Sequence, residues 1–190
     1  MILEGIVTSS NADGSINVAP MGPIVDETMT WLRFRPFQTA ATFENLKRHR
    51  VGVFHVTDDV LLLARAAIGR LDEVPLTQSA EKVEGAVLSD ACRWYEFEIE
   101  SVDDSQERAT LEARVVHKGR IRDFFGFNRA KHAVLEAAIL STRVALIPPD
   151  EIRREFGRLK IAVDKTAGPR EREAFALLEE YVEECLSSLM

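Results

Sequence analysis

Apolar and polar residues alternate in two short stretches at the start of the chain, residues 2–10 and 15–20. This period of two is typical of strands that bury one face of a sheet. An Asp-Gly dipeptide lies between the stretches and supplies the positive φ angles that a tight hairpin turn needs. The pattern predicts a β-hairpin whose second strand ends at Pro20 and Pro23, because proline donates no hydrogen bond to a sheet.

The alternation continues at residues 29–35, where Leu32 and Phe34 share one face of a predicted strand. The opposite face carries Trp31, Arg33 and Arg35. A short helix is predicted at 40–49. A buried strand rich in β-branched residues is predicted at 51–56.

Residues 58–67 form a second predicted helix, whereas residues 70–93 have no clear period and are expected to be irregular or partly helical. Alternation returns over 94–101 and 108–115, which predict a second hairpin. Three acidic residues share one face of it and are expected to face solvent opposite a row of arginines: Glu96, Glu98 and Glu100.

The last third of the chain has the three- and four-residue spacing of helices. Asn128 is expected to cap a helix over about 129–142. Asp150 is expected to cap a second helix that ends near Phe156. Pro169 begins the last helix, whose apolar seam consists of Phe175, Leu178, Val182, Cys185 and Leu189. Strands first and helices last predict an α+β fold around a small, mainly antiparallel barrel.

The totals change this picture little. The chain has 190 residues, of which 46% are hydrophobic and 29% charged, as expected for one globular domain or one domain with an appendage. A net charge of −7 argues against general binding to nucleic acid or to an anionic membrane. There is no apolar run of membrane-spanning length and no signal peptide, and the two cysteines have no metal-type or redox-type spacing. We therefore expect a cytoplasmic protein.

Several common kinds of site have no signature in the sequence. There is no glycine-rich dinucleotide motif and no phosphate-binding loop. The four histidines never fall at metal-binding spacing with a carboxylate partner, and no Ser–His–Asp set stands out. No metal site is predicted, and the hydrolase and metalloenzyme interpretations are weak.

The first candidate site is an anion-binding segment. Arg33 and Arg35 share a strand face, and Thr39 and Thr42 follow at the predicted helix start. Helix N–H groups and the positive end of the helix dipole bind phosphate, and arginine adds charge-assisted bonds. The alternative is a barrel strand with solvent-facing arginines, followed by an ordinary helix.

The second candidate is the segment 117–132, which carries five Lys and Arg residues against one acid. Cations in the first turn of the predicted helix oppose its dipole, and a broken local rule often marks function. An anion held by Asn128, Arg129 and His132 would remove the conflict. The alternative is a solvated basic loop with salt bridges to Glu136 and to the glutamate-rich hairpin. The phenylalanines of the segment are interpreted as hydrophobic anchors rather than stacking platforms: Phe124, Phe125 and Phe127.

Two motifs, Asn-x-Ala-Pro-Met within residues 13–21 and Thr-x-x-Thr-x-Glu-Asn within 33–45, resemble the flavin reductase-like, FMN-binding split-barrel superfamily. Within it the chain is most similar to an uncharacterised group of about this length, which shares residues 126–134 and the pair Thr142-Arg143. The resemblance implies a split barrel and a homodimer, with FMN in a cleft at the subunit interface. It also implies cofactor-binding residues on the first half of the chain: Asn17, Val18 and Ala19 at the isoalloxazine ring, Arg33, Arg35, Thr39 and Thr42 toward the phosphate, and Asn45 supporting the helix start.

The cluster of Asn128, Arg129 and His132 has no counterpart in the minimal barrel of that superfamily, so its place at the flavin is our own inference. The FMN-binding split-barrel domain is predicted to span 1–145, including the helix at about 129–142. Residues 146–190 are predicted to form a C-terminal helical appendage packed on the same domain.

The function predicted in this way is that of an FMN-dependent oxidoreductase. It would pass hydride or electrons between reduced FMN and a small organic substrate, such as a pterin or another flavin. The chain has no dedicated nicotinamide-binding motif, so the electron donor stays open. Two alternatives also stay open: an FMN-binding electron carrier or sensor without turnover of its own, and a cofactor-free interaction domain whose basic segment binds an acidic partner.

Overall fold

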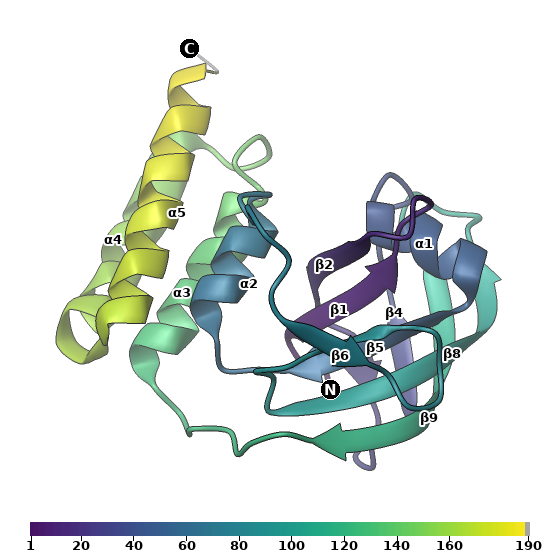
Figure 1. Ribbon diagram of the computed structural model, residues 1–190. Helices are drawn as coiled ribbons and strands as arrows, with labels where there is room; N and C mark the ends of the chain where they lie inside the picture. The colour runs from purple at the N-terminus through teal and green to yellow at the C-terminus, as the bar shows by residue number, and fades with distance from the viewer. Residues whose placement is uncertain (189–190) are drawn as a thin grey trace. The chain divides into compact units, whose positions relative to one another are not determined.

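The computed structural model describes residues 1–188, and the chain divides into two compact units. The first unit contains Met1–Thr57 and Glu73–Phe124, and it holds the strands (Figure 1). The second unit contains Asp58–Asp72 and the chain from Phe125 onward, and it consists mainly of helices. None of the helices within residues 1–188 has the length and apolar character needed to cross a membrane. The division into two units does not test the predicted boundary near residue 145 between an FMN-binding domain and a helical appendage. That boundary stays a prediction.

One antiparallel sheet of seven strands forms most of the first unit, in the order β2-β1-β5-β8-β9-β4-β3. The strands are β1 (Gly5–Ser10), β2 (Ile16–Met21), β3 (Ile24–Val25), β4 (Trp31–Phe34), β5 (Val51–Val56), β8 (Arg93–Asp103) and β9 (Thr110–Arg120). Near the chain start, Ile2 pairs with Ile24 and the Leu3 N–H donates to the Pro23 carbonyl at 3.1 Å. These bonds join β3 to the segment before β1, so the sheet curls on itself (Figure 1). The predicted α+β split-barrel fold is confirmed.

The core of the barrel is built from alternating residues of these strands. Leu32 and Phe34 of β4 are fully buried, as their alternation predicted. Helix α1 (Ala41–His49) packs Phe43 and Leu46 against the same core. This packing fixes the start of α1 beside β1 and β2.

The predicted hairpin of β1 and β2 is confirmed, with Gly14 at a φ angle of 83° in its turn. The prediction that Pro20 ends the second strand is wrong, because Pro20 lies within β2 and pairs with Ile6. β2 is an edge strand of the sheet, and proline is tolerated there because its missing N–H faces away from the ladder.

Residues 73–92 are mostly irregular, as predicted, but they also contain a hairpin of β6 (Thr77–Ser79) and β7 (Ala86–Leu88) that the sequence did not indicate. Val83 and Val87 of this segment pack against Val53 of β5 and Trp94 of β8. The segment therefore covers part of the outer face of the sheet.

Because residues 73–92 lie over the sheet, one expectation about the glutamate-rich hairpin, the solvent exposure of Glu96, needs correction. Glu98 and Glu100 are exposed as predicted, but Glu96 is fully buried under residues 73–92, so the prediction of a solvated Glu96 is wrong. Alternation along β8 shows which residues share a face. It does not show that another part of the chain covers that face.

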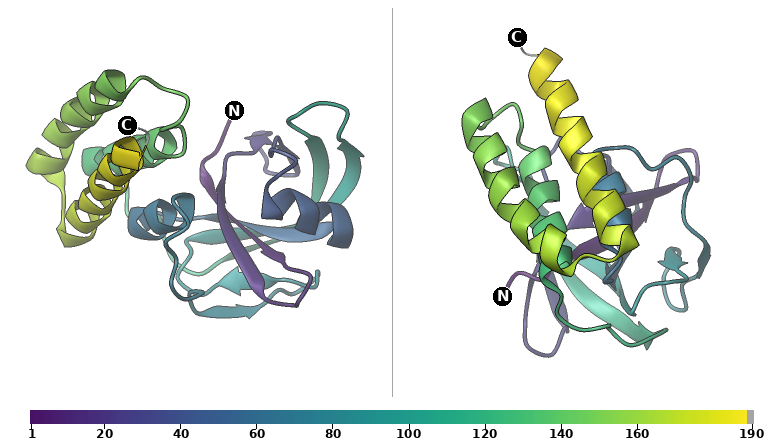
Figure 2. Two further views of the ribbon diagram at one scale, coloured as in Figure 1. Left: turned by 90° about the horizontal axis from the view of Figure 1, so that it is seen from above. Right: turned by 90° about the vertical axis from the view of Figure 1, so that its left-hand side faces the viewer.

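Four helices form the second unit: α2 (Val60–Ala67), α3 (Arg129–Ser141), α4 (Pro149–Thr166) and α5 (Pro169–Ser188). Helices α3, α4 and α5 pack side by side (Figure 2). Asn128 caps α3, as predicted. Helix α4 is longer than predicted, because its buried positions continue from Phe156 to Val163. Its N-cap is Pro148 and not Asp150. In the predicted seam of α5, Phe175, Leu178 and Val182 are buried, Cys185 is half-buried, and Leu189 lies outside the described residues.

Candidate functional site

A buried polar cluster joins the first hairpin of the barrel to the start of α1. The side-chain amide of Asn17 donates to Ser9 Oγ at 3.2 Å and to Thr42 Oγ1 at 2.9 Å. The amide of Asn45 donates to the same Ser9 oxygen at 3.2 Å and to Asn11 Oδ1 at 2.8 Å. We call these five residues the amide–hydroxyl cluster. It brings together three of the predicted cofactor-binding residues: Asn17, Thr42 and Asn45.

The directions of these bonds show whether the Ser9 and Thr42 hydroxyl groups can still donate a hydrogen bond. Ser9 Oγ accepts two amide N–H groups, which use both of its lone pairs, and Thr42 Oγ1 accepts one. Each hydroxyl therefore has a proton left to donate, and neither finds an acceptor within residues 1–188. Ser9 is only 6% exposed and Thr42 only 3%. A buried polar group without its hydrogen bond costs about 1–3 kcal/mol, so the cluster is suited to an acceptor from outside the chain.

The N-terminus of α1 is open beside these hydroxyls. Its N-cap residue, Ala40, has no side-chain oxygen to accept a hydrogen bond. Along the described chain the N–H groups of Ala41 and Thr42 have no acceptor, and the first bonded one is that of Phe43, at 2.9 Å from the Ala40 carbonyl. Free N–H groups and the positive end of the helix dipole attract an anion. Thr42 is thus at the helix start as predicted, whereas Thr39 is exposed just before it.

The two predicted arginines lie in different surroundings. Arg33 Nε donates to Glu112 Oε1 at 2.6 Å across β4 and β9, and its guanidinium carbon lies 4.8 Å from the centre of the Trp31 ring. Glu112 Oε2 is buried and has no hydrogen-bond partner among the residues that the structure describes. Arg35 is exposed, and its side chain makes no hydrogen bond or ion pair within residues 1–188. Phosphate binding by either arginine stays a prediction.

The two remaining ring-side residues, Val18 and Ala19, are half-buried in β2. They pair with Thr8 and Val7 of β1. Because β2 is an edge strand, its outer side leaves backbone N–H and C=O groups unpaired by the sheet. Such groups are suitable hydrogen-bond partners for the polar edge of a heteroaromatic ring.

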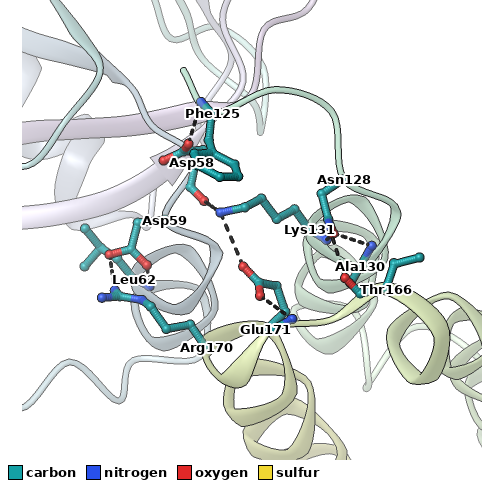
Figure 3. A network of polar contacts seen from close by, with 11 residues as sticks. Asp58, Asp59, Leu62, Phe125, Asn128, Ala130, Lys131, Thr166, Arg170 and Glu171 are labelled. Carbon is teal, nitrogen blue, oxygen red and sulfur yellow. Dashed lines mark hydrogen bonds and ion pairs between the residues drawn. The ribbon is translucent and has the colours of Figure 1, made fainter. Parts of the chain in front are cut away.

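In the second unit, a polar network fixes the beginning of α3 (Figure 3). Asn128 Oδ1 accepts from the N–H groups of Ala130 and Lys131, and Asn128 Nδ2 donates to the Thr166 carbonyl at 3.1 Å. Lys131 Nζ donates to the Asp58 carbonyl at 2.5 Å and lies 3.3 Å from Glu171 Oε1. The side chains of Asn128 and Lys131 are therefore used within the unit itself.

Arg129 and His132, the other two members of the predicted anion cluster, are exposed. Neither side chain makes a hydrogen bond or an ion pair with any residue that the structure describes. The salt bridge to Glu136 that belongs to the alternative interpretation is not formed within residues 1–188. Anion binding by Asn128, Arg129 and His132 stays a prediction.

Ser9 and Asn11 were not predicted as site residues. One signal was present, because the predicted hairpin places Ser9 directly opposite Asn17 in the register of β1 and β2. The packing of Asn45 against both residues was not visible in the sequence, since it depends on where α1 docks. No set of His, Cys, Asp or Glu side chains within residues 1–188 is arranged to hold a metal ion.

The curled antiparallel barrel, with a capless helix start beside its first hairpin, is a split-barrel fold. Several solved structures share this fold. One is nitrilotriacetate monooxygenase component B from Bacillus cereus, at 18% identity and a TM-score of 0.51 over 64% of this chain and 69% of that chain. Another is the styrene monooxygenase flavin reductase from Pseudomonas putida S12, at 14% identity and a TM-score of 0.51 over 63% of this chain and 80% of that chain.

Residues 3–122 match the N-terminal domain of the family described as protein of unknown function DUF447, and residues 128–180 match a second part of that family. The chain belongs to this family. A solved structure of the same family is the FMN-bound protein from Methanosarcina mazei. It is 23% identical, with a TM-score of 0.82, over 95% of this chain and 94% of that chain. The resemblance stated from the two sequence motifs is confirmed.

Proposed function

We propose that this protein is an FMN-binding flavoprotein and that the hydroxyls of Ser9 and Thr42, with the start of α1, hold the FMN phosphate. The observation that carries the proposal is the pair of buried hydroxyl protons, on Ser9 and Thr42, that have no acceptor within residues 1–188. Together with the free N–H groups of Ala41 and Thr42 they supply four donors to one anion. The FMN-bound relative and the flavin reductase fold support the same cofactor.

Six more of the predicted residues keep their proposed roles around the cofactor. Asn17, Val18 and Ala19 would border the isoalloxazine ring, where backbone N–H groups of the edge strand β2 would set its reduction potential. Asn45 would act as a positioning residue, because its bonds to Ser9 and Asn11 hold the cluster together. Arg35 and Thr39, both exposed, would add donors to the phosphate.

We further propose that the protein is a cytoplasmic homodimer with FMN at the subunit interface. Bound FMN supplies reversible hydride and electron transfer, and the chain supplies binding, orientation and electrostatics. The proposed reaction is the reduction of a small organic molecule by reduced FMN, with a pterin or a second flavin as candidate substrates. The likeness to reductase structures and the implied superfamily arrangement support this proposal.

The phosphate assignment is tested by removing one hydroxyl at a time. Thr42→Val and Ser9→Ala should each weaken FMN binding by about 1.5–3 kcal/mol, the usual value of a hydrogen bond to a charged group. Thr42→Ser, which keeps the hydroxyl, should restore binding. The measurement is the dissociation constant of FMN by fluorescence titration, with circular dichroism to show that each variant is folded.

The matched control is Ser10→Ala, because Ser10 is the next residue of β1 and points to the other side of the strand. Its FMN affinity should equal that of the wild type. If Ser9→Ala and Thr42→Val also bind FMN with unchanged affinity, the phosphate lies elsewhere. If the wild type neither purifies with flavin nor takes up added FMN, the flavoprotein proposal itself is wrong.

Turnover is tested separately from binding. Anaerobic mixing of the FMN-loaded protein with NADH or NADPH should bleach the visible flavin absorbance within seconds if the protein is a reductase. Bleaching by dithionite but not by either nicotinamide would instead support the carrier or sensor alternative.

A further inference from the structure

The segment just before α3 exposes two large aromatic side chains. Phe125 is 88% exposed and Phe127 is 107% exposed, whereas Phe156 and Phe175 of the same unit are almost fully buried. Neither ring is part of the buried core of this unit, and their interpretation as hydrophobic anchors stays a prediction. Neighbouring exposed apolar side chains can mark a binding site.

These rings extend from a backbone that is held in place at several points. The Phe125 N–H donates to Asp58 Oδ2 at 2.9 Å, and Asn128 closes the following turn by capping α3 (Figure 3). Lys131, in the first turn of α3, is tied to Asp58 and Glu171. The segment is therefore preorganised, which lowers the entropic cost of binding a ligand.

Two cations follow the aromatic residues closely in the sequence. Arg129 and His132 are three residues apart in α3, so they are neighbours on one side of the helix. Within residues 1–188 neither is paired, whereas Lys131 between them is paired. Both also stand in the first turn, where a cation is disfavoured by the helix dipole. A bound anion would offset that cost. The helix N–H groups themselves are not involved, because Asn128 Oδ1 already accepts two of them.

We propose that Phe125, Phe127, Arg129 and His132 form a binding surface for a planar heteroaromatic ring that carries an anionic group. The phenyl rings would stack on the heterocycle, and Arg129 and His132 would bind its phosphate or carboxylate. The inference rests on the proposed function in one respect. A flavoprotein that transfers electrons needs a second substrate, and we assign planar heteroaromatic anions as the class of substrate that this surface binds.

The test uses the full-length protein loaded with FMN and two probes that differ in the anion. Folate carries a pterin ring with carboxylates, and FAD carries an isoalloxazine ring with phosphates. Phe127→Ala and Arg129→Ala should each raise the dissociation constant of at least one probe about tenfold, in line with the loss of a stacking or charged contact. Riboflavin, which has the ring without the anion, and inorganic phosphate, which has the anion without a ring, should bind at least tenfold more weakly than the better probe.

Two controls match the exposure and charge of the altered residues. Leu146→Ala removes an apolar side chain that is 79% exposed in the same unit, and Lys165→Ala removes an exposed cation from the end of α4. Both should leave the probe affinities unchanged. If Phe127→Ala and Arg129→Ala also leave them unchanged, or change the oligomeric mass instead, the surface does not bind an aromatic anion and the proposal is overturned.

FMN content is measured on every sample, which separates this proposal from the proposed function. Loss of FMN by Ser9→Ala with normal probe binding concerns only the barrel site. Loss of probe binding by Phe127→Ala with normal FMN content is the result expected here. Wild-type protein that holds FMN but binds neither folate nor FAD overturns the inference and leaves the flavoprotein proposal standing.

Discussion

His55 is a fully buried histidine whose two ring nitrogens are both used in the neutral state. Nδ1 lies 3.2 Å from the Ile6 carbonyl, so it carries the proton and donates, and Nε2 accepts the Leu88 N–H at 3.1 Å. Burial lowers the pKa of His55 from 6.5 to about 4, although the bond to Ile6 acts in the opposite direction. Protonation would turn Nε2 into a donor facing the donor of Leu88, which explains why the neutral form is favoured.

This pKa predicts how the stability of the first unit depends on pH. The unfolded chain binds a proton near pH 6.5 and the folded chain only near pH 4, so the stabilisation is fully present above 6.5. It is lost by about 1.4 kcal/mol per pH unit as the pH falls through that window. Urea unfolding at several pH values should show this slope, and His55→Asn should flatten it. Exposed His49→Asn is the control and should keep the wild-type slope; an equal slope in wild type and His55→Asn would contradict the assignment.

The hairpin of β6 and β7 is attached to the barrel through a buried carboxylate. Glu96 Oε2 accepts the N–H groups of Lys82 at 2.6 Å and of Val83 at 3.1 Å. Glu96 Oε1 accepts the N–H of Glu81 at 2.8 Å and the Trp94 indole N–H at 3.1 Å. Burial alone would raise the pKa of Glu96, but these four donors outweigh it and the pKa is lowered. The Glu96 carboxylate thus holds a turn that has few other polar ties to the sheet.

Glu96→Gln should release this segment, because an amide N–H₂ would face backbone donors. We expect a loss of about 2–3 kcal/mol in the unfolding free energy, the value of hydrogen bonds to a charged group together with the donors left unpaired. Limited trypsinolysis should also cut faster after exposed Lys82. Glu98→Gln is the matched control: Glu98 forms an exposed ion pair with Arg114, which is worth at most about 1 kcal/mol. Equal effects of the two substitutions would show that Glu96 has no special role.

The elements that could be predicted from the sequence are those with local signals. The first hairpin has its Asp-Gly turn, α3 has Asn128 as its cap, and Leu32 and Phe34 follow the alternation of β4. Each signal depends only on residues close together in the sequence, so tertiary contacts elsewhere do not change it. The same holds for Thr42, whose place at a helix start follows from the local pattern.

The features that could not be predicted depend on contacts between distant segments. The cover over Glu96 is made by backbone N–H groups, which every residue except proline has, so no side-chain pattern reveals it. The bond from Asn45 to Ser9 spans 36 residues and exists only because α1 docks at that end of the barrel. Arg33 could be assigned to a strand face, but its pairing with Glu112 depends on the register of β4 and β9.

At the scale of the whole molecule, the proposed homodimer makes FMN binding and assembly interdependent. A ligand that contacts both protomers stabilises the dimer, and by thermodynamic reciprocity dimer formation raises the affinity for that ligand by the same factor. The predicted ring-side residues lie on β2, an edge strand whose outer side pairs with no other strand of the described sheet.

We therefore expect saturating FMN to lower the dissociation constant of the dimer by about 5- to 150-fold, the range of typical coupling energies. Sedimentation equilibrium with and without FMN measures this shift as a change in the population with twice the 21.3 kDa mass of one chain. At the same FMN concentration, the dissociation constant of the dimer should change less in Thr42→Val, because this variant binds less FMN. Ser10→Ala should behave like the wild type. Stoichiometric FMN binding with no change in dimer dissociation would contradict an interface site and would mean that one protomer encloses the cofactor by itself.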